Sequence, residues 1–171
     1  MSHESEIHIA GQAVRFSEVT MAIYAAITLL GVIAAASWKG LFVDYPELVV
    51  LVIGTTITVA VAHLWANVAA HRLVDQRPMS SPQRWKEFRV TLSVFVVGIL
   101  ALVALALSWT ISDDLETSVR WTIGMLILVL FVVGLVGSRR RGATWPRAVG
   151  WGCVDASIGV AVLIAKIVAG S

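Results

Sequence analysis

Five long runs of apolar residues constrain this chain more than any other feature of its sequence. They cover residues of about 17–38, 48–70, 90–111, 119–138 and 148–170. A helix needs about 20 residues, at 1.5 Å each, to cross the hydrocarbon of a bilayer. Because an unpaired backbone amide costs several kcal/mol in lipid, such isolated runs are expected to be helical. The sequence therefore predicts an all-α, polytopic membrane helix bundle with five transmembrane helices.

The composition excludes an ordinary soluble protein. Apolar residues make up 58% of the 171 residues and charged residues only 14%, whereas charged residues approach a quarter of a typical soluble domain. The polar segments are short, so we expect a single transmembrane domain over residues 1–171, with residues 1–16 as a short N-terminal tail. This tail has neither the basic start nor the cleavage site of a signal peptide. The first helix is therefore expected to stay in the mature protein.

Basic residues are expected to gather at one end of the bundle. Ten of the 13 Lys and Arg residues lie in the N-terminal tail, in segment 71–89 or in segment 139–147. Loops rich in Lys and Arg remain on the cytoplasmic side of a membrane. We therefore expect a cytoplasmic N-terminus and an outside C-terminus in the bacterial plasma (inner) membrane. Pro78 and Pro82 break up segment 71–89, which is expected to be a loop.

The basic segments do not predict a nucleic-acid partner. Asp75 and Glu87 interrupt the longest of them, and membrane topology and anionic lipids account for its charge. The expected partners are membrane lipids and either a second copy of the chain or a partner membrane protein. Small residues that let helix backbones approach closely favour such packing: Gly134, Gly137, Gly152, Ala156 and Gly159.

Three of the five predicted helices carry a polar face. At 100° per residue, His63 and Asn67 fall on one side of the second helix, together with Thr56. Tyr24 lies on a face of hydroxyl and small residues in the first helix, and Asp155 lies among glycines in the fifth. We therefore expect the first, second and fifth helices to form the inside of the bundle. The third and fourth helices are expected to face lipid.

Tyr24, His63 and Asp155 are also expected to share one depth. Each lies eight or nine residues from an arginine near the cytoplasmic end of its helix, which corresponds to about 12 to 14 Å. A lone carboxylate inside a membrane costs about 2.5 to 3.5 kcal/mol, so Asp155 needs a proton, a partner or water. His63 is the expected partner of Asp155, with Asn67 one turn nearer the cytosol.

Two hypotheses of function follow from this placement. Ionisable residues inside a membrane are candidate functional residues. Tyr24, His63, Asn67 and Asp155 are therefore predicted to line a route or binding site for a proton or small cation in a channel or transporter. Alternatively, the polar residues form a buried hydrogen-bonded pair that only fixes the packing of the helices. A second hypothesis is a non-catalytic structural or accessory subunit of a membrane complex, whose polar helices dock against a partner protein.

Other chemistry finds no support in the sequence. It contains no nucleophile elbow, no zinc-protease motif and no phosphate-binding glycine loop, so neither an enzymatic activity nor a cofactor is predicted. His63 and His71 lie about 12 Å apart along one helix, which is too far for a shared metal ion. No metal site is predicted.

Three segments carry a resemblance to a known group: "MAIYAAITLLGVIAA", "AHLWANVAAH" and "GCVDASIGVAVLIAKIV". They resemble uncharacterised small multi-pass integral membrane proteins of actinobacterial type. That group has a Tyr in the first helix, A-H-x-aromatic-A in the second and a Lys near the C-terminus, which match Tyr24, Ala62–Ala66 and Lys166 here. The resemblance covers the first, second and fifth helices and little of the middle. It implies a membrane protein without a particular activity.

Overall fold

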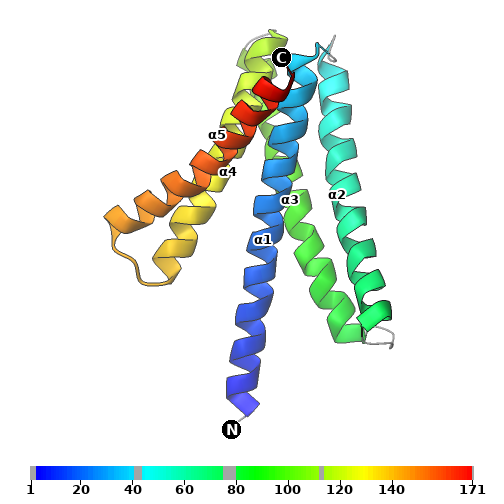
Figure 1. Cartoon of the computed structure of the whole chain (residues 1–171), viewed down its shortest axis with the longest axis vertical. Helices are drawn as coiled ribbons and strands as arrows, with labels where there is room; N and C mark the ends of the chain where they lie inside the picture. Colours follow the sequence, from blue (N-terminus) through cyan, green and yellow to red (C-terminus); the bar gives the residue numbers. More distant parts are fainter. Residues whose placement is uncertain (1–2, 41–43, 75–79, 112–113, 171) are drawn as a thin grey trace.

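The computed structural model describes residues 3–40, 44–74, 80–111 and 114–170. Within these ranges the chain forms five α-helices (Figure 1): α1 (His3–Trp38), α2 (Tyr45–Val74), α3 (Ser81–Ile111), α4 (Leu115–Arg140) and α5 (Trp145–Gly170). Each contains a segment that is long and apolar enough to cross a membrane. The prediction of an all-helical fold with five such helices is confirmed.

The expectation of a loop over residues 71–89 is wrong. α2 continues to Val74 and α3 already begins at Ser81. The backbone N–H of Ser80 donates to Oε1 of Gln83 at 2.8 Å, as in a capping box whose third helical residue bonds back to the cap. Pro82 lies in the first turn, where its missing N–H costs no helical hydrogen bond. The residues that suggested a loop therefore start a helix.

Aspartates cap the starts of α2 and α4. Oδ1 of Asp44 accepts a hydrogen bond from the backbone N–H of Glu47 at the start of α2, and Asp114 caps α4. Pro46 and Pro146 lie in the first turns of α2 and α5, where the missing N–H of a proline costs no helical hydrogen bond. Residues 3–16, expected as a tail, continue α1 as a helix.

α1 lies at the centre of the bundle, as expected, but α3 shares this position and α5 does not, so the expected division into inner and outer helices is wrong for these two helices. α1 packs against each of the other helices, and α3 packs against α1, α2 and α4. α5 packs on α4 and α1 and is the most exposed of the five. Polar faces mislead here because lipid is as apolar as leucine, so shape and close packing decide which helices are buried.

Glycines allow the closest approaches between helices. A Cβ at Gly98 of α3 would lie 2.5 Å from Oγ1 of Thr56 on α2, and a Cβ at Gly152 of α5 would lie 2.8 Å from the carbonyl oxygen of Phe131 on α4. Gly134 and Gly159 are similarly crowded. The close packing expected at Gly134, Gly152 and Gly159 is confirmed. It is not found at Gly137, where a Cβ would meet nothing within 4 Å.

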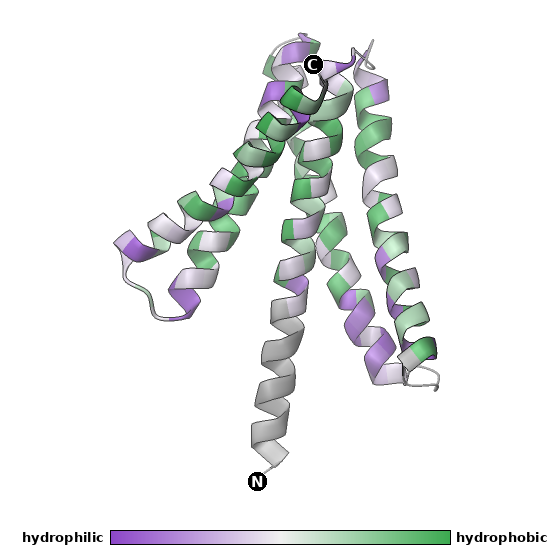
Figure 2. Cartoon of the chain, viewed as in Figure 1, coloured by the Kyte–Doolittle hydropathy of each residue, from purple (hydrophilic) through white to green (hydrophobic). Residues whose placement is uncertain are grey.

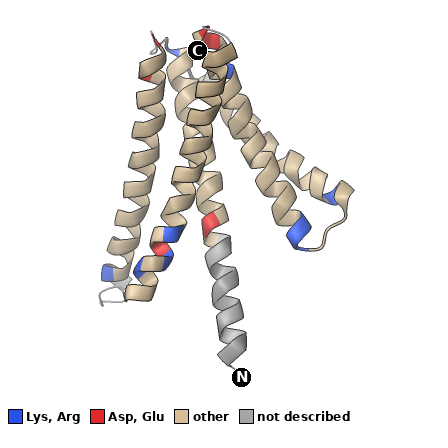
Figure 3. Cartoon of the chain, turned by 180° about the vertical axis from the view of Figure 1, so that it is seen from behind, with Lys and Arg blue, Asp and Glu red and all other residues tan. Residues whose placement is uncertain are grey.

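Charged residues gather at the two ends of the bundle, and the helices between them are largely apolar (Figures 2 and 3). We call one the basic end; it carries the N-terminus, Arg84, Lys86 and Arg139–Arg141. The opposite, acidic end carries the C-terminus and the acidic residues of the α1–α2 and α3–α4 connections: Asp44, Glu47, Asp114 and Glu116.

Candidate functional site

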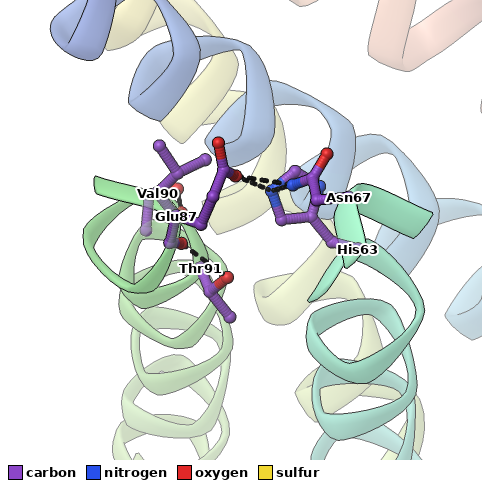
Figure 4. A network of polar contacts seen from close by, with 6 residues as sticks. His63, Asn67, Glu87, Val90 and Thr91 are labelled. Atoms are coloured by element: carbon purple, nitrogen blue, oxygen red, sulfur yellow. Dashed lines mark hydrogen bonds and ion pairs between the residues drawn. The ribbon is translucent and has the colours of Figure 1, made fainter. Parts of the chain in front are cut away.

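A polar cluster of His63, Asn67 and Glu87 joins α2 to α3 (Figure 4). Nδ2 of Asn67 lies 3.0 Å from Nε2 of His63, one helical turn away. Glu87 reaches across from α3, and its Oε2 accepts a hydrogen bond from Nδ2 of Asn67 at 2.5 Å. The same oxygen lies 3.5 Å from Nε2 of His63. The side chains of His63 and Glu87 are only 17% and 20% exposed, so most of this acid–base pair is covered by protein.

The packing of α2 on α3 explains why these side chains meet. Thr56, His63 and Asn67 are spaced by seven and four residues, so they share one face of α2. Glu87 lies three turns before Gly98 on the same face of α3. Thr56 packs directly on Gly98, which has no side chain to hold the helices apart. The helices are therefore close enough for the short side chain of Asn67 to span the gap.

The donor and acceptor capacity of an imidazole allows this cluster two hydrogen-bonding patterns, which differ by one proton on His63. When the imidazole is neutral and carries its proton on Nδ1, Nε2 accepts from the amide of Asn67, which also donates to Glu87. When the imidazole is protonated, Nε2–H faces the carboxylate of Glu87, and Asn67 has to turn its amide away from that hydrogen. Asn67 therefore contacts both of the groups between which a proton would be held.

The cluster lies near the basic end of the apolar part of α3. Lys86 and Arg89 flank Glu87, and the buried face of α3 starts at Val90. Arg89 also forms an ion pair with Glu18 of α1, at 3.4 Å. The expected depth of His63, about 12 to 14 Å from the basic end of α2, stays a prediction.

Asp155 does not meet His63, contrary to expectation. It lies on α5, and its carboxylate rests against Gly134 of α4, where a Cβ would be 2.4 Å from Oδ2. α5 packs against α4 and α1, whereas His63 contacts α3. Within the part of the chain that the structure describes, no donor or cation pairs with the Asp155 carboxylate.

Tyr24 also lies apart from the cluster. Its side chain is 56% exposed on α1, and its carbonyl accepts a hydrogen bond from Thr28 within the helix. Of the four predicted site residues, the structure brings together His63 and Asn67. Tyr24 and Asp155 lie on other surfaces.

Sequence reasoning missed Glu87 as a member of the site. It treated this residue only as an acidic interruption of a basic loop. The spacing of Glu87, Thr91, Val94 and Gly98 is that of a single helical face, and Thr91 and Val94 are buried. That spacing was the available signal, but the expected loop hid it.

The cluster does not provide a metal site. Among the described side chains, no three His, Cys, Asp or Glu residues gather closely enough to hold a metal ion. The cluster offers one imidazole, one carboxylate and one amide. This set can bind and release a proton and can hold it between nitrogen and oxygen.

No family model, no curated protein and no solved structure matches this chain.

Proposed function

We propose that this protein is a multi-pass protein of the bacterial plasma membrane, with its N-terminus in the cytoplasm and its C-terminus outside. The support is the separation of charge along the bundle, with Arg139–Arg141 and the arginines of α3 at the basic end (Figure 3). Cytoplasmic loops carry an excess of Lys and Arg. The basic end is therefore the cytoplasmic end.

The function that the geometry supports best is the handling of protons or small cations, with the cluster of His63, Asn67 and Glu87 as the proton-binding site. The observation that carries this proposal is the 3.5 Å contact between Nε2 of His63 and Oε2 of Glu87 across two packed helices. An imidazole nitrogen can take up and release a proton. A shielded carboxylate beside it gives the proton a second place to bind.

Passage across the bilayer requires movement of the helices. Between the cluster and the acidic end, buried apolar side chains fill the space between α1, α2 and α3. They include Leu30, Val59, Val94 and Val97, each at most 8% exposed. Such a close-packed apolar core has no room for a continuous chain of water molecules. A proton or cation taken up at His63 therefore moves on only when α2 and α3 shift relative to each other. This favours a transporter over an open channel.

A proton-flux assay in liposomes tests this proposal. The wild-type chain is expected to carry protons faster than lipid-only vesicles, and His63→Ala and Glu87→Gln are expected to slow the flux by about tenfold or more. Glu18→Gln is the matched control, since Glu18 is an acid at the same end that pairs with Arg89 outside the cluster. Wild-type flux equal to that of empty vesicles, or equal flux in all four proteins, would overturn the proposal.

An accessory role in a membrane complex is the second candidate, and Asp155 favours it. A carboxylate in a membrane span without an internal partner is costly unless a proton, water or another protein accompanies it. Cys153 is exposed on the same helix and is the only cysteine of the chain. Cross-linking through Cys153 in native membranes is therefore expected to capture a partner protein or a second copy, and Asp155→Asn is expected to reduce the product. Purely monomeric protein in those membranes would exclude this role.

A further inference from the structure

A groove between α3 and α4 near the acidic end plays no part in the proposed proton site. Its volume is about 600 Å³, which is within the usual range of small-molecule sites. It is lined almost entirely by apolar side chains, among them Val103, Leu107, Ile111, Met125 and Leu128. Val103 and Ile111 are eight residues apart, so the groove runs for about 12 Å along α3. This length is close to the hydrocarbon depth of one leaflet, about 15 Å.

Gly124 keeps this groove open. It lines the groove, and a Cβ added there would meet nothing within 4 Å. A second apolar hollow of about 380 Å³ shares Met125 and Leu128 with the first. The two hollows together reach down α3 to Ser93, about 27 Å from Ile111. The first hollow, about as long as one leaflet is deep, is the part of this path that suits one acyl chain.

The outer rim of the groove carries an arginine that is paired with a glutamate one turn away. Arg120 lines it and forms an exposed ion pair with Glu116 one turn away. Asp114 is engaged elsewhere, because its carboxylate accepts hydrogen bonds from the backbone and side chain of Thr117. The indole of Trp121, also at the rim, is 55% exposed, as is common at the headgroup level of a membrane.

We propose that this groove binds one zwitterionic phospholipid of the phosphatidylethanolamine class. One acyl chain lies in the groove over Gly124, the headgroup phosphate accepts hydrogen bonds from Arg120, and the ammonium group donates to Glu116. An exposed Arg–Glu pair contributes little by itself, so it opens readily to a ligand that satisfies both charges. The lipid site goes beyond the proposed proton handling and does not depend on it.

Native mass spectrometry of the delipidated full-length chain tests this proposal, with palmitoyl-oleoyl phosphatidylethanolamine and phosphatidylglycerol as probes. The wild-type chain is expected to retain phosphatidylethanolamine about tenfold better than phosphatidylglycerol, a difference in affinity that corresponds to about 1.4 kcal/mol. Gly124→Phe fills the groove and is expected to abolish retention. Gly54→Phe is the matched control, since Gly54 is an exposed glycine on α2 with nothing within 4 Å of its Cβ position.

Two rim variants separate the headgroup contacts from the acyl-chain contact. Glu116→Gln is expected to remove the preference for ethanolamine while both lipids still bind, and Arg120→Gln is expected to weaken both lipids. The proposal is wrong if folded Gly124→Phe retains as much lipid as Gly54→Phe does. It is also wrong if the wild-type chain retains both lipids equally.

Discussion

The contact between Gly98 and Thr56 is expected to control how closely α2 approaches α3, and Gly98→Ala tests this. A Cβ at Gly98 would lie 2.5 Å from Oγ1, 2.7 Å from Cγ2 and 3.1 Å from Cβ of Thr56. Carbon atoms pack best at about 3.5 to 4.0 Å, so the helices have to separate by about 1 Å. Thr56 cannot easily turn aside, because a β-branched residue has few rotamers in a helix and its Oγ1 donates to the carbonyl of Val52 at 2.7 Å.

The expected cost follows from this overlap. Extra atoms in a well-packed core destabilise a protein by about 1 to 3 kcal/mol. Replacing a helical glycine with alanine also stabilises the helix by up to about 1 kcal/mol, because alanine has the higher helix propensity. We therefore expect Gly98→Ala to lower the free energy of unfolding by about 1 to 2 kcal/mol. The same separation lengthens the contact between His63 and Glu87, so proton flux is expected to fall as well.

Unfolding by sodium dodecyl sulfate in mixed micelles, followed by circular dichroism, measures this loss. Thr56→Ala removes the two closest atoms, so the double variant is expected to recover most of the loss, with a coupling energy above about 0.5 kcal/mol. Gly54→Ala is the control, since its Cβ meets nothing within 4 Å. If Gly98→Ala is as stable as Gly54→Ala, or if the double-variant energies simply add, the packing argument fails.

Three further predictions concern the cluster, a helix cap and a turn. Asn67→Ala removes a donor from Glu87 and is expected to lower the free energy of unfolding by about 1 to 2 kcal/mol; the same detergent unfolding measures it, and an unchanged midpoint would contradict it. Hydrogen bonds from the side chain and backbone of Thr117 lower the pKa of Asp114. The N-cap that Asp114 forms therefore stabilises the fold fully at pH values above 3.8, the usual pKa of an aspartate, and this stabilisation is lost as the pH falls through the lowered pKa. The gap in melting temperature between wild type and Asp114→Ala is therefore expected to shrink below about pH 4, and a gap that is constant with pH would refute this. Gly142 has a φ of +82° in the turn before α5, so Gly142→Val is expected to cost about 1 to 2 kcal/mol in the same unfolding assay, and a neutral result would show that the turn adapts.

The part of the fold that depends on local composition was predictable from the sequence. Runs of apolar residues longer than a bilayer is thick have to be helical, since backbone groups in lipid must bond within their own segment. The number of helices and the entry prolines of α2 and α5 follow from such local rules. The start of α3 is also encoded locally, in the hydrogen bond between Ser80 and Gln83.

The partners of the polar side chains were decided only by the tertiary structure. The sequence by itself determined that His63 and Asn67 share a face of α2, because helical periodicity acts within one segment. It did not determine which helix covers that face, because lipid and leucine are equally apolar and hydropathy does not rank one neighbour above another. The fit of Thr56 on Gly98 brings α3 to this face, so His63 meets Glu87, while Asp155 rests against Gly134. Periodicity belongs to one helix, whereas shape complementarity belongs to a pair of helices.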